Sequence, residues 1–177
     1  MKESSPNNVR EKTRLLCATA LGVAAYVALS MSFKLPIVRN IGLDFGYIAL
    51  AIYCYLYGGR CGAVVGGMGC AIVSLLASGW FPPGWVLGNI FIGALCGGSY
   101  NRDGSKLAFA ENASISYGAC LIGIGVIKTV VECLLFHLPL GTKIVSNGLA
   151  GAIDGFTMEV GVLITPAIQR ALKETTR

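Results

Sequence analysis

Apolar and polar residues are distributed along this chain in long blocks, with six apolar stretches separated by short polar breaks. The first stretch, 15–33, carries no charge and is long enough to cross a hydrocarbon core of about 30 Å as a helix. The second, 45–57, is shorter and is predicted to form a short or partly buried span. Four further spans are expected at 61–78, 85–100, 113–138 and 145–169.

The breaks between these stretches contain residues that end helices. Gly58, Gly59 and Arg60 are expected to form a tight turn between the second and third spans. The segment 79–85 contains two adjacent prolines, which lack amide donors and clash with the preceding turn of a helix. The sequence therefore predicts an all-α membrane protein, a compact bundle of six transmembrane helices.

Composition and charge agree with a membrane protein. Of the 177 residues, 54% are hydrophobic and 13% are charged, where about 25% charged residues are usual in soluble domains. Lys and Arg gather at the side of the bundle that holds both termini, which is therefore predicted to be cytoplasmic. The segments 1–14 and 171–177 are then a cytoplasmic N-terminal segment and tail around a transmembrane domain at 15–170. The basic residues on the terminus side are Lys2, Arg10, Lys12, Arg14, Arg60, Arg102, Lys106, Arg170, Lys173 and Arg177, against Lys34, Arg39 and Lys143 on the other side.

The sequence argues against several classes of function. The basic residues are explained by membrane orientation, so the net charge of +5 does not indicate a nucleic-acid partner. The seven cysteines lie in or beside apolar stretches without a CxxC pair, which favours packing over metal binding. The sequence contains no Walker-type loop, HExxH or GxSxG motif. We expect no enzyme activity, no catalytic residue and no metal site.

Small residues recur at intervals of one helical turn in the first span. Ala20, Ala24 and Ala28 share one face, and Ala18, Gly22 and Ala25 are expected to widen it. Small residues let helix backbones approach closely in a bilayer. The same spacing occurs in the third, fourth and sixth spans, so the face could serve packing inside the bundle or an external partner.

Charged residues also occur inside the predicted spans. Lys128 and Glu132 lie four residues apart and share one helix face, and Asp154 lies in the last span. A charge at the bilayer centre costs at least about 2.5 kcal/mol, so such residues usually face a cavity, a partner or a substrate path. Counting residues from the helix ends places these three in the outer half of the membrane.

Polar and aromatic residues of several spans and loops are thus expected to converge at the outer end of the bundle. This set predicts a pocket for a small, flat, polar ligand. The alternative is a structural ion cluster with ordinary interfacial tryptophans. Glu159 and His137 are left without a role. The expected substrate-binding residues are Arg39, Trp80, Trp85, Asn89, Lys128, Glu132, Asn147 and Asp154.

The segment 13–98 resembles the substrate-binding S components of energy-coupling-factor (ECF) vitamin transporters of prokaryotes. The resemblance rests on the alanine-striped segment 21–30, the tripeptide Lys34-Leu35-Pro36 and the segment 56–67, in this order and spacing. It implies a multi-pass protein of the cytoplasmic membrane that binds a vitamin at the extracellular face. It also implies a complex with a coupling transmembrane subunit and two cytosolic ATPases. The ATPases use the ATP, so no cofactor is expected in this chain.

In that family the alanine face of the first helix docks on the coupling subunit, which implies this role for Ala20, Ala24 and Ala28. The segment 81–87 looks like a turn in folate-type members, although its second proline and Trp85 depart from the pattern. A folate-like heterocycle is therefore the leading expected substrate. Two alternatives stay open: a stand-alone secondary transporter or channel that uses Lys128 and Glu132 as a charge relay, and an assembly or sensor subunit without a ligand.

Overall fold

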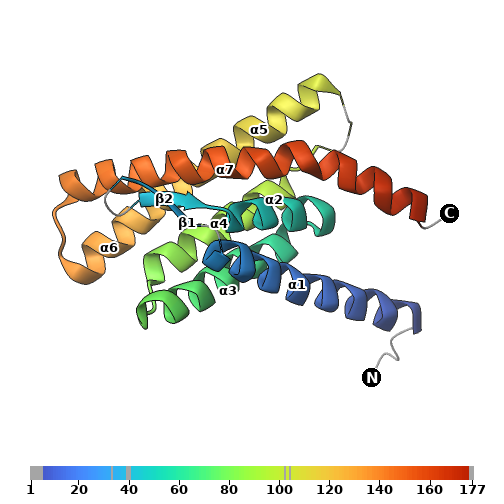
Figure 1. Cartoon of the computed structure of the whole chain (residues 1–177), viewed down its shortest axis with the longest axis horizontal. Coiled ribbons are helices and arrows are strands. Elements are labelled where there is room, and N and C mark those ends of the chain that lie inside the picture. Colours follow the sequence, from blue (N-terminus) through green and yellow to red (C-terminus); the bar gives the residue numbers. More distant parts are fainter. Residues whose placement is uncertain (1–5, 33, 39–40, 102, 104, 176–177) are drawn as a thin grey trace.

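The computed structural model describes residues 6–32, 34–38, 41–101, 103 and 105–175. Within these residues the chain forms six continuous helices and one short hairpin (Figure 1). The fifth helix is continuous from Lys106 to Phe136, with a π-helical segment, η1, between α5 and α6. The elements are α1 (Pro6–Ser32), β1 (Lys34–Val38), β2 (Ile41–Asp44), α2 (Gly46–Tyr57), α3 (Gly59–Ser78), α4 (Pro83–Gly98), α5 (Lys106–Cys120), η1 (Leu121–Lys128), α6 (Thr129–Phe136) and α7 (Leu140–Thr175).

The predicted all-α membrane bundle is confirmed. Among the described residues, four helices are long and apolar enough to cross a membrane. Two apolar helices are shorter, α2 and α4. The 12 residues of α2 span only about 18 Å, so this helix is packed within the bundle, with Leu50 and Tyr47 fully buried. The four long helices are Val9–Ser32, Gly59–Ser78, Lys106–Phe136 and Leu140–Glu174.

The helix ends differ from the ends of the apolar stretches. The helix α1 begins at Pro6, well before the apolar stretch, and the fifth helix begins at Lys106 instead of 113. Hydropathy marks the part of a helix that lies in lipid, whereas polar residues continue the same helix into water. The turn before α3 is confined to Gly58, whose φ of 90° ends α2, while Gly59 and Arg60 already belong to α3.

The segment between α1 and α2 was expected to be a plain polar break, and the structure instead forms an antiparallel hairpin there. The strand β1 pairs with β2 in a register that sets Lys34 opposite Asp44 and Leu35 opposite Leu43. The backbone groups of this connection thus bond to each other where no helix can supply partners. The hairpin brings the end of β2 directly to the start of α2.

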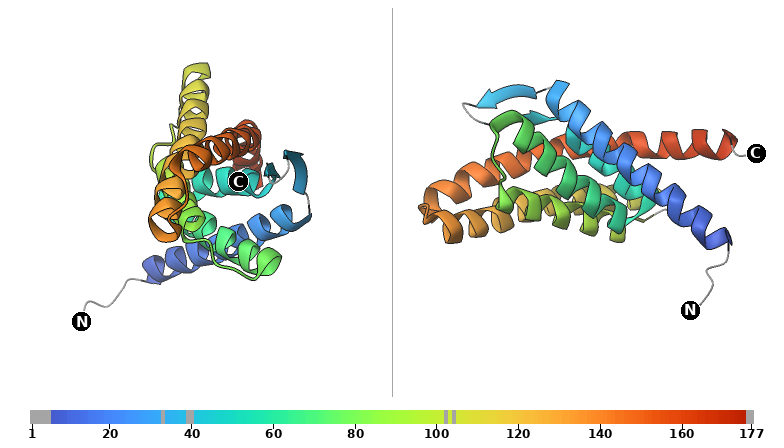
Figure 2. Two further views of the ribbon diagram at one scale, coloured as in Figure 1. Left: turned by 90° about the vertical axis from the view of Figure 1, so that its left-hand side faces the viewer. Right: turned by 90° about the horizontal axis from the view of Figure 1, so that it is seen from below.

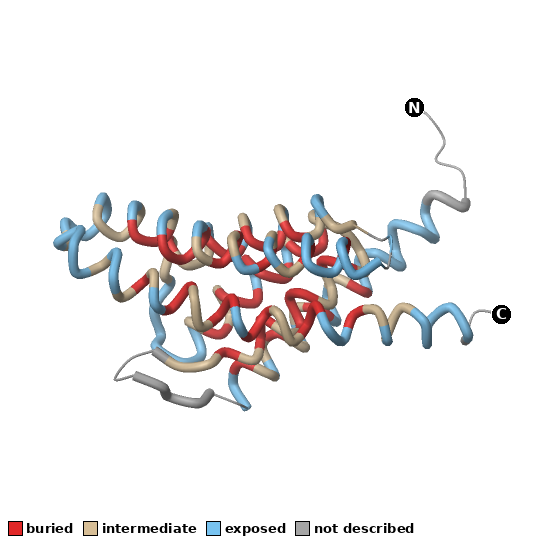
Figure 3. Tube along the Cα trace, turned by 90° about the horizontal axis from the view of Figure 1, so that it is seen from above, coloured by how far each residue is buried: buried red, intermediate tan, exposed pale blue. Residues whose placement is uncertain are grey.

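Both termini lie at one end of the bundle, and the hairpin and the α6–α7 connection lie toward the other (Figures 1 and 2). Buried residues follow the inner sides of the helices, while the ends of α1 and α7 near the termini are exposed (Figure 3). Large apolar side chains are also exposed, as expected where lipid is the solvent. Those more than 60% exposed include Leu16, Leu21, Leu134, Val145 and Phe156.

The closest helix packing joins α3 to α4 through glycines. A Cβ atom on Gly62 would overlap the carbonyl oxygen of Gly93, and a Cβ on Gly93 would overlap that of Gly62. The two backbones are therefore in direct contact, as small residues four apart allow in a bilayer. This contact fixes α4, and with it the residues at its N-terminal end.

We expect Gly62→Ala to lower the stability of the purified protein by about 1–3 kcal/mol, because the added methyl group meets the backbone of α4 and the Cβ of Cys54. Thermal unfolding in detergent micelles measures the effect. The matched control is Gly98→Ala, since a Cβ there has no heavy atom within 4 Å. Equal shifts in the two variants would contradict the role of the Gly62–Gly93 contact.

Candidate ligand-binding site

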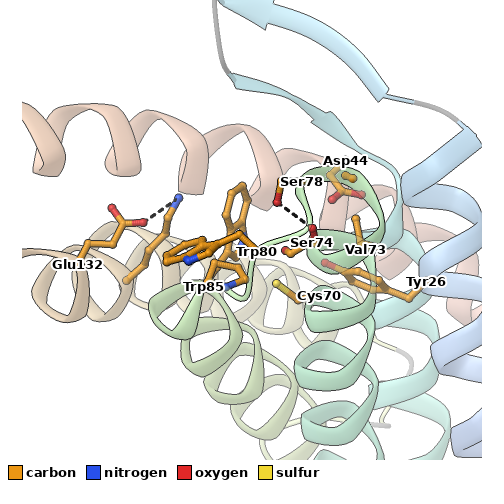
Figure 4. A pocket seen from close by; sticks show the side chains of 12 residues that line it. Tyr26, Asp44, Cys70, Val73, Ser74, Ser78, Trp80, Trp85 and Glu132 are labelled. Atoms are coloured by element: carbon orange, nitrogen blue, oxygen red, sulfur yellow. Dashed lines mark hydrogen bonds and ion pairs between the residues drawn. The ribbon is translucent and has the colours of Figure 1, made fainter. Parts of the chain in front are cut away.

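A cavity of about 340 Å³ opens in the half of the bundle opposite the termini. We call it the aromatic cavity. Figure 4 shows Asp44 at one side of it and Glu132 at the other, with Trp80 and Trp85 between them. It is enclosed by α1, β2, α3, the α3–α4 connection, α4 and the η1–α6 part of the fifth helix. Its lining is Tyr26, Asp44, Cys70, Val73, Ser74, Ala77, Ser78, Trp80, Pro82, Trp85, Lys128 and Glu132.

Trp85 forms the central wall of this cavity. Pro83 begins α4, which suits the first helical position because its missing amide would have no partner there. Trp85 therefore lies in the first turn, where its Nε1 donates a hydrogen bond to the hydroxyl of Tyr47 at 3.3 Å. The ammonium of Lys128 lies 3.7 Å from the centroid of the indole ring. A desolvated cation over Trp is among the stronger interactions of this type.

Lys128 and Glu132 come from the continuous fifth helix. Lys128 is 6% exposed and is the last residue of η1. Such π-helical segments alter the direction of side chains and are frequent at functional sites. The predicted pair forms, with Lys128 Nζ 3.9 Å from Glu132 Oε1. Glu132 Oε2 also meets Lys143 Nζ of α7 at 3.2 Å, so the carboxylate links two helices.

Asn147 of α7 holds this charged group in place by hydrogen bonds. Its Nδ2 donates to Thr129 Oγ1 at 3.0 Å and to Glu132 Oε2 at 3.3 Å. The residue is buried and lies outside the described lining of the cavity. Its position is that of a residue that orients Glu132. The pairing of Lys128 with Glu132 expected from the sequence is therefore present at one side of the cavity, and Lys143 joins it.

Sequence reasoning missed most of the other lining residues, among them Asp44 and Tyr26. Asp44, the last residue of β2, is 8% exposed, and its Oδ1 accepts hydrogen bonds from Ser30 Oγ at 2.6 Å and from the amide of Gly46 at 2.9 Å. Tyr26 packs edge-on against Tyr47 with ring centroids 6.1 Å apart. The spacing of four residues from Gly22 and Ser30 places Tyr26 on the same face of α1 as these two, and the packing of α1 turns that face inward. An isolated acidic residue beside an apolar span was the signal for Asp44.

Other expected site residues take different places. Asn89 and Asp154 are buried but lie outside the described lining. Asn89 Nδ2 donates to the carbonyl of Trp85 at 3.0 Å, which stabilises the first turns of α4. Trp80 is 52% exposed and packs against Phe136 at 5.4 Å between centroids. Arg39 lies outside the described residues. A direct role for each in binding stays a prediction.

The outward face of α1 carries the three alanines that the resemblance singled out. Ala20, Ala24 and Ala28 are all exposed, and we call them the alanine strip. The expectation that Ala18, Gly22 and Ala25 widen this strip was wrong for Ala18 and Gly22. Both are buried, and a Cβ on Gly22 would come within 2.7 Å of Val65 Cγ2 of α3. Two faces with the same four-residue spacing therefore run along one helix, one toward the bundle and one away from it.

The fold and the aromatic cavity define a class: a multi-pass membrane protein with a binding-type cavity at one end. Residues 10–172 match the family model described as "ECF-type riboflavin transporter, S component". The chain belongs to this family of ECF transporter S components. Two curated relatives are called UPF0397 proteins. One, from Lactococcus lactis subsp. cremoris (strain SK11), is 23% identical over 89% of this chain and 86% of its own length. The other, from Streptococcus thermophilus, is 24% identical over 88% and 89%.

A solved structure has the same fold. The crystal structure of the S component for biotin from an ECF-type ABC transporter covers 95% of both chains with a TM-score of 0.69. At 15% sequence identity this likeness concerns the fold alone. The six-helix arrangement is thereby confirmed. The family model confirms the resemblance stated from the sequence, and the family is one of membrane transport.

Proposed function

We propose that this chain captures a vitamin with a flat heterocyclic ring in the aromatic cavity, on the side of the membrane opposite its termini. The observation that carries the proposal is a cavity of about 340 Å³ with Trp80 and Trp85 between polar groups at its two sides. Its size falls in the usual range for small-molecule sites, and a few placed polar groups among aromatic walls are typical of them. Membership in the S-component family supports the same class of function.

We propose a flavin-like ligand ahead of a folate-like one. Among the described lining residues the charged groups are two carboxylates, Asp44 and Glu132, and one ammonium, Lys128. Lys128 is already paired with Glu132. A folate-like ligand brings carboxylates of its own, which the acidic lining disfavours, whereas a flavin ring is neutral and offers alternating hydrogen-bond donors and acceptors. The description of the matching family also names riboflavin. The segment 81–87 favoured a folate-like ligand, whereas the lining of the cavity favours a flavin-like one.

The proposed partners are a coupling transmembrane subunit and two cytosolic ATPases. The exposed alanine strip supports docking of the coupling subunit, because a smooth helix face permits close approach of a second helix in lipid. The basic flanks at the terminus end support a cytoplasmic placement of both termini. ATP would be hydrolysed by the partners, and this chain would bind and release the vitamin.

We expect the purified chain alone to bind riboflavin with a Kd below about 1 μM in the absence of ATP. Quenching of riboflavin fluorescence measures the affinity, with folic acid and biotin as competitors. Mass spectrometry of the small molecule retained after mild purification gives an independent identification. Tighter binding of folic acid than of riboflavin would make a folate-like ligand the preferred one for the aromatic cavity.

The two alternative functions give different results. Ligand uptake into proteoliposomes that contain only this chain would favour a secondary transporter or channel. Binding of none of these vitamins, together with no retained small molecule, would favour an assembly or sensor subunit. Either result would overturn the proposed function.

A further inference from the structure

A second cavity, of about 430 Å³, lies at the end of the bundle that holds the termini. It is lined by Tyr100, Asn101 and Ser105 between α4 and α5, by the first turns of α5 and by the last part of α7. The function proposed above does not use it. We call it the basic cavity. The residues that carry the argument are Asn101, Ser105, Lys106, Phe109, Gln169 and Arg170.

The charges of the basic cavity have one sign. Lys106 and Arg170 come from different helices, and no acidic side chain is found among the described residues of the lining. Neither cation forms an ion pair within the described part of the chain. Two unpaired cations supply hydrogen-bond donors that suit phosphate oxygens. The side-chain amide of Asn101 is already engaged, since its Nδ2 donates to Glu111 Oε2 at 2.9 Å, so the cations carry the recognition. This differs from the aromatic cavity, where the cation is already neutralised.

The walls of the basic cavity are held in place by hydrogen bonds. The amide of Asn101 donates to Asn112 Oδ1 at 2.9 Å, and Asn112 Nδ2 donates back to the carbonyl of Asn101 at 2.8 Å. Gln169 Nε2 donates to the hydroxyl of Tyr100 at 3.2 Å, which ties α7 to the same connection. The cavity is therefore built before any ligand arrives.

A proline of α7 lies in the wall of the cavity. Pro166 is inside the helix and lines the cavity together with Val162, four residues earlier. Because proline has no amide, it cannot donate to the carbonyl of Val162 within the helix.

Exposed apolar side chains adjoin the two cations. Leu107 follows Lys106 directly and is 80% exposed, and Phe109 lies on the lining itself. On α7, Leu163 and Ile164 are exposed within two turns of Arg170. Apolar surface next to a cationic cavity suits a ligand whose charged head continues into hydrocarbon chains.

We propose that the basic cavity binds a phosphate-bearing anion, and that its occupant is the headgroup of an anionic phospholipid of the leaflet on the terminus side. Basic cavities between transmembrane helices on the cytoplasmic side are suited to such headgroups. A soluble phosphate offers the same oxygens without the acyl chains. The site is independent of the vitamin site, so it can fail or succeed alone.

The test is native mass spectrometry of the delipidated full chain, titrated with phosphatidylglycerol, phosphatidylcholine or inorganic phosphate. We expect the double variant Lys106→Gln/Arg170→Gln to bind phosphatidylglycerol about thirtyfold more weakly, since each cation near the headgroup contributes. The matched control is Lys12→Gln/Lys173→Gln, which removes two exposed cations at the same end, outside the described lining. This control should keep the affinity.

Equal weakening in the two double variants would overturn the site, because it would indicate a general charge effect. Equal affinity of the unaltered chain for phosphatidylglycerol and phosphatidylcholine would also overturn it. Displacement of phosphatidylglycerol by inorganic phosphate at similar concentrations would overturn the lipid as occupant and assign the site to a soluble phosphate. Riboflavin binding should be the same in all three proteins, which confirms that each is folded.

Discussion

Trp85→Ala is expected to weaken flavin binding by about 30- to 1000-fold, the range of an aromatic residue at the centre of a binding surface. The substitution removes the central wall of the aromatic cavity. It also removes the ring beneath the Lys128 ammonium and the hydrogen bond to Tyr47. Fluorescence titration of the purified variant with riboflavin measures the loss.

Two further variants separate this effect from general damage. Trp85→Phe keeps an aromatic ring over which Lys128 can lie, so it should retain most of the affinity. Phe156→Ala removes a large aromatic side chain that is 66% exposed on α7, outside the described lining, and should leave binding unchanged. Unaltered affinity in Trp85→Ala would refute the aromatic cavity as the vitamin site.

Ala24→Leu is expected to abolish co-purification with the coupling subunit while riboflavin binding stays intact. Ala24 lies at the middle of the alanine strip and is exposed, so a larger side chain projects outward and does not enter the bundle. Filling a tightly packed contact with extra methylene groups costs about 1–3 kcal/mol at a single position. Ala20→Leu and Ala28→Leu, each made singly, should also weaken assembly, which a pull-down of the co-expressed complex can follow.

The control for the docking face is the same substitution on another helix. Ala94 of α4 is also exposed, and Ala94→Leu should leave assembly unchanged. Normal assembly of Ala24→Leu would exclude the strip as the docking face. Loss of assembly in both variants would point to a general effect of bulk on the bundle surface, and it too would count against the strip.

The ion cluster shows that the sequence can predict which residues share a helix face, but not which residues of other helices lie beside that face. The four-residue spacing of Lys128 and Glu132 is sufficient to predict their pairing. The depth estimates also placed Asp154 in the outer half of the membrane, but depth does not give the direction of a side chain around the helix axis. The packing of α7 against the fifth helix decides that direction. It places Asn147 behind Glu132 and outside the described lining.

The hairpin and the first helix give the same lesson. Asp44 enters the cavity only because β1 and β2 fold back and deliver it to the start of α2. The sequence shows two faces on α1 with equal spacing, and it does not say which one turns inward. Contact of Gly22 with α3 settles this, and it leaves the alanine strip outside.

The sequence by itself determined that this chain is a six-helix membrane protein, because long apolar stretches between polar breaks can satisfy their backbone groups in lipid only as helices. It also determined which residues share a helix face, since that follows from the helical repeat. The tertiary structure alone decided which faces meet. Contacts between distant segments such as Gly62 with Gly93, or Lys128 with Trp85, depend on the mutual rotation of helices, and no local pattern records that rotation.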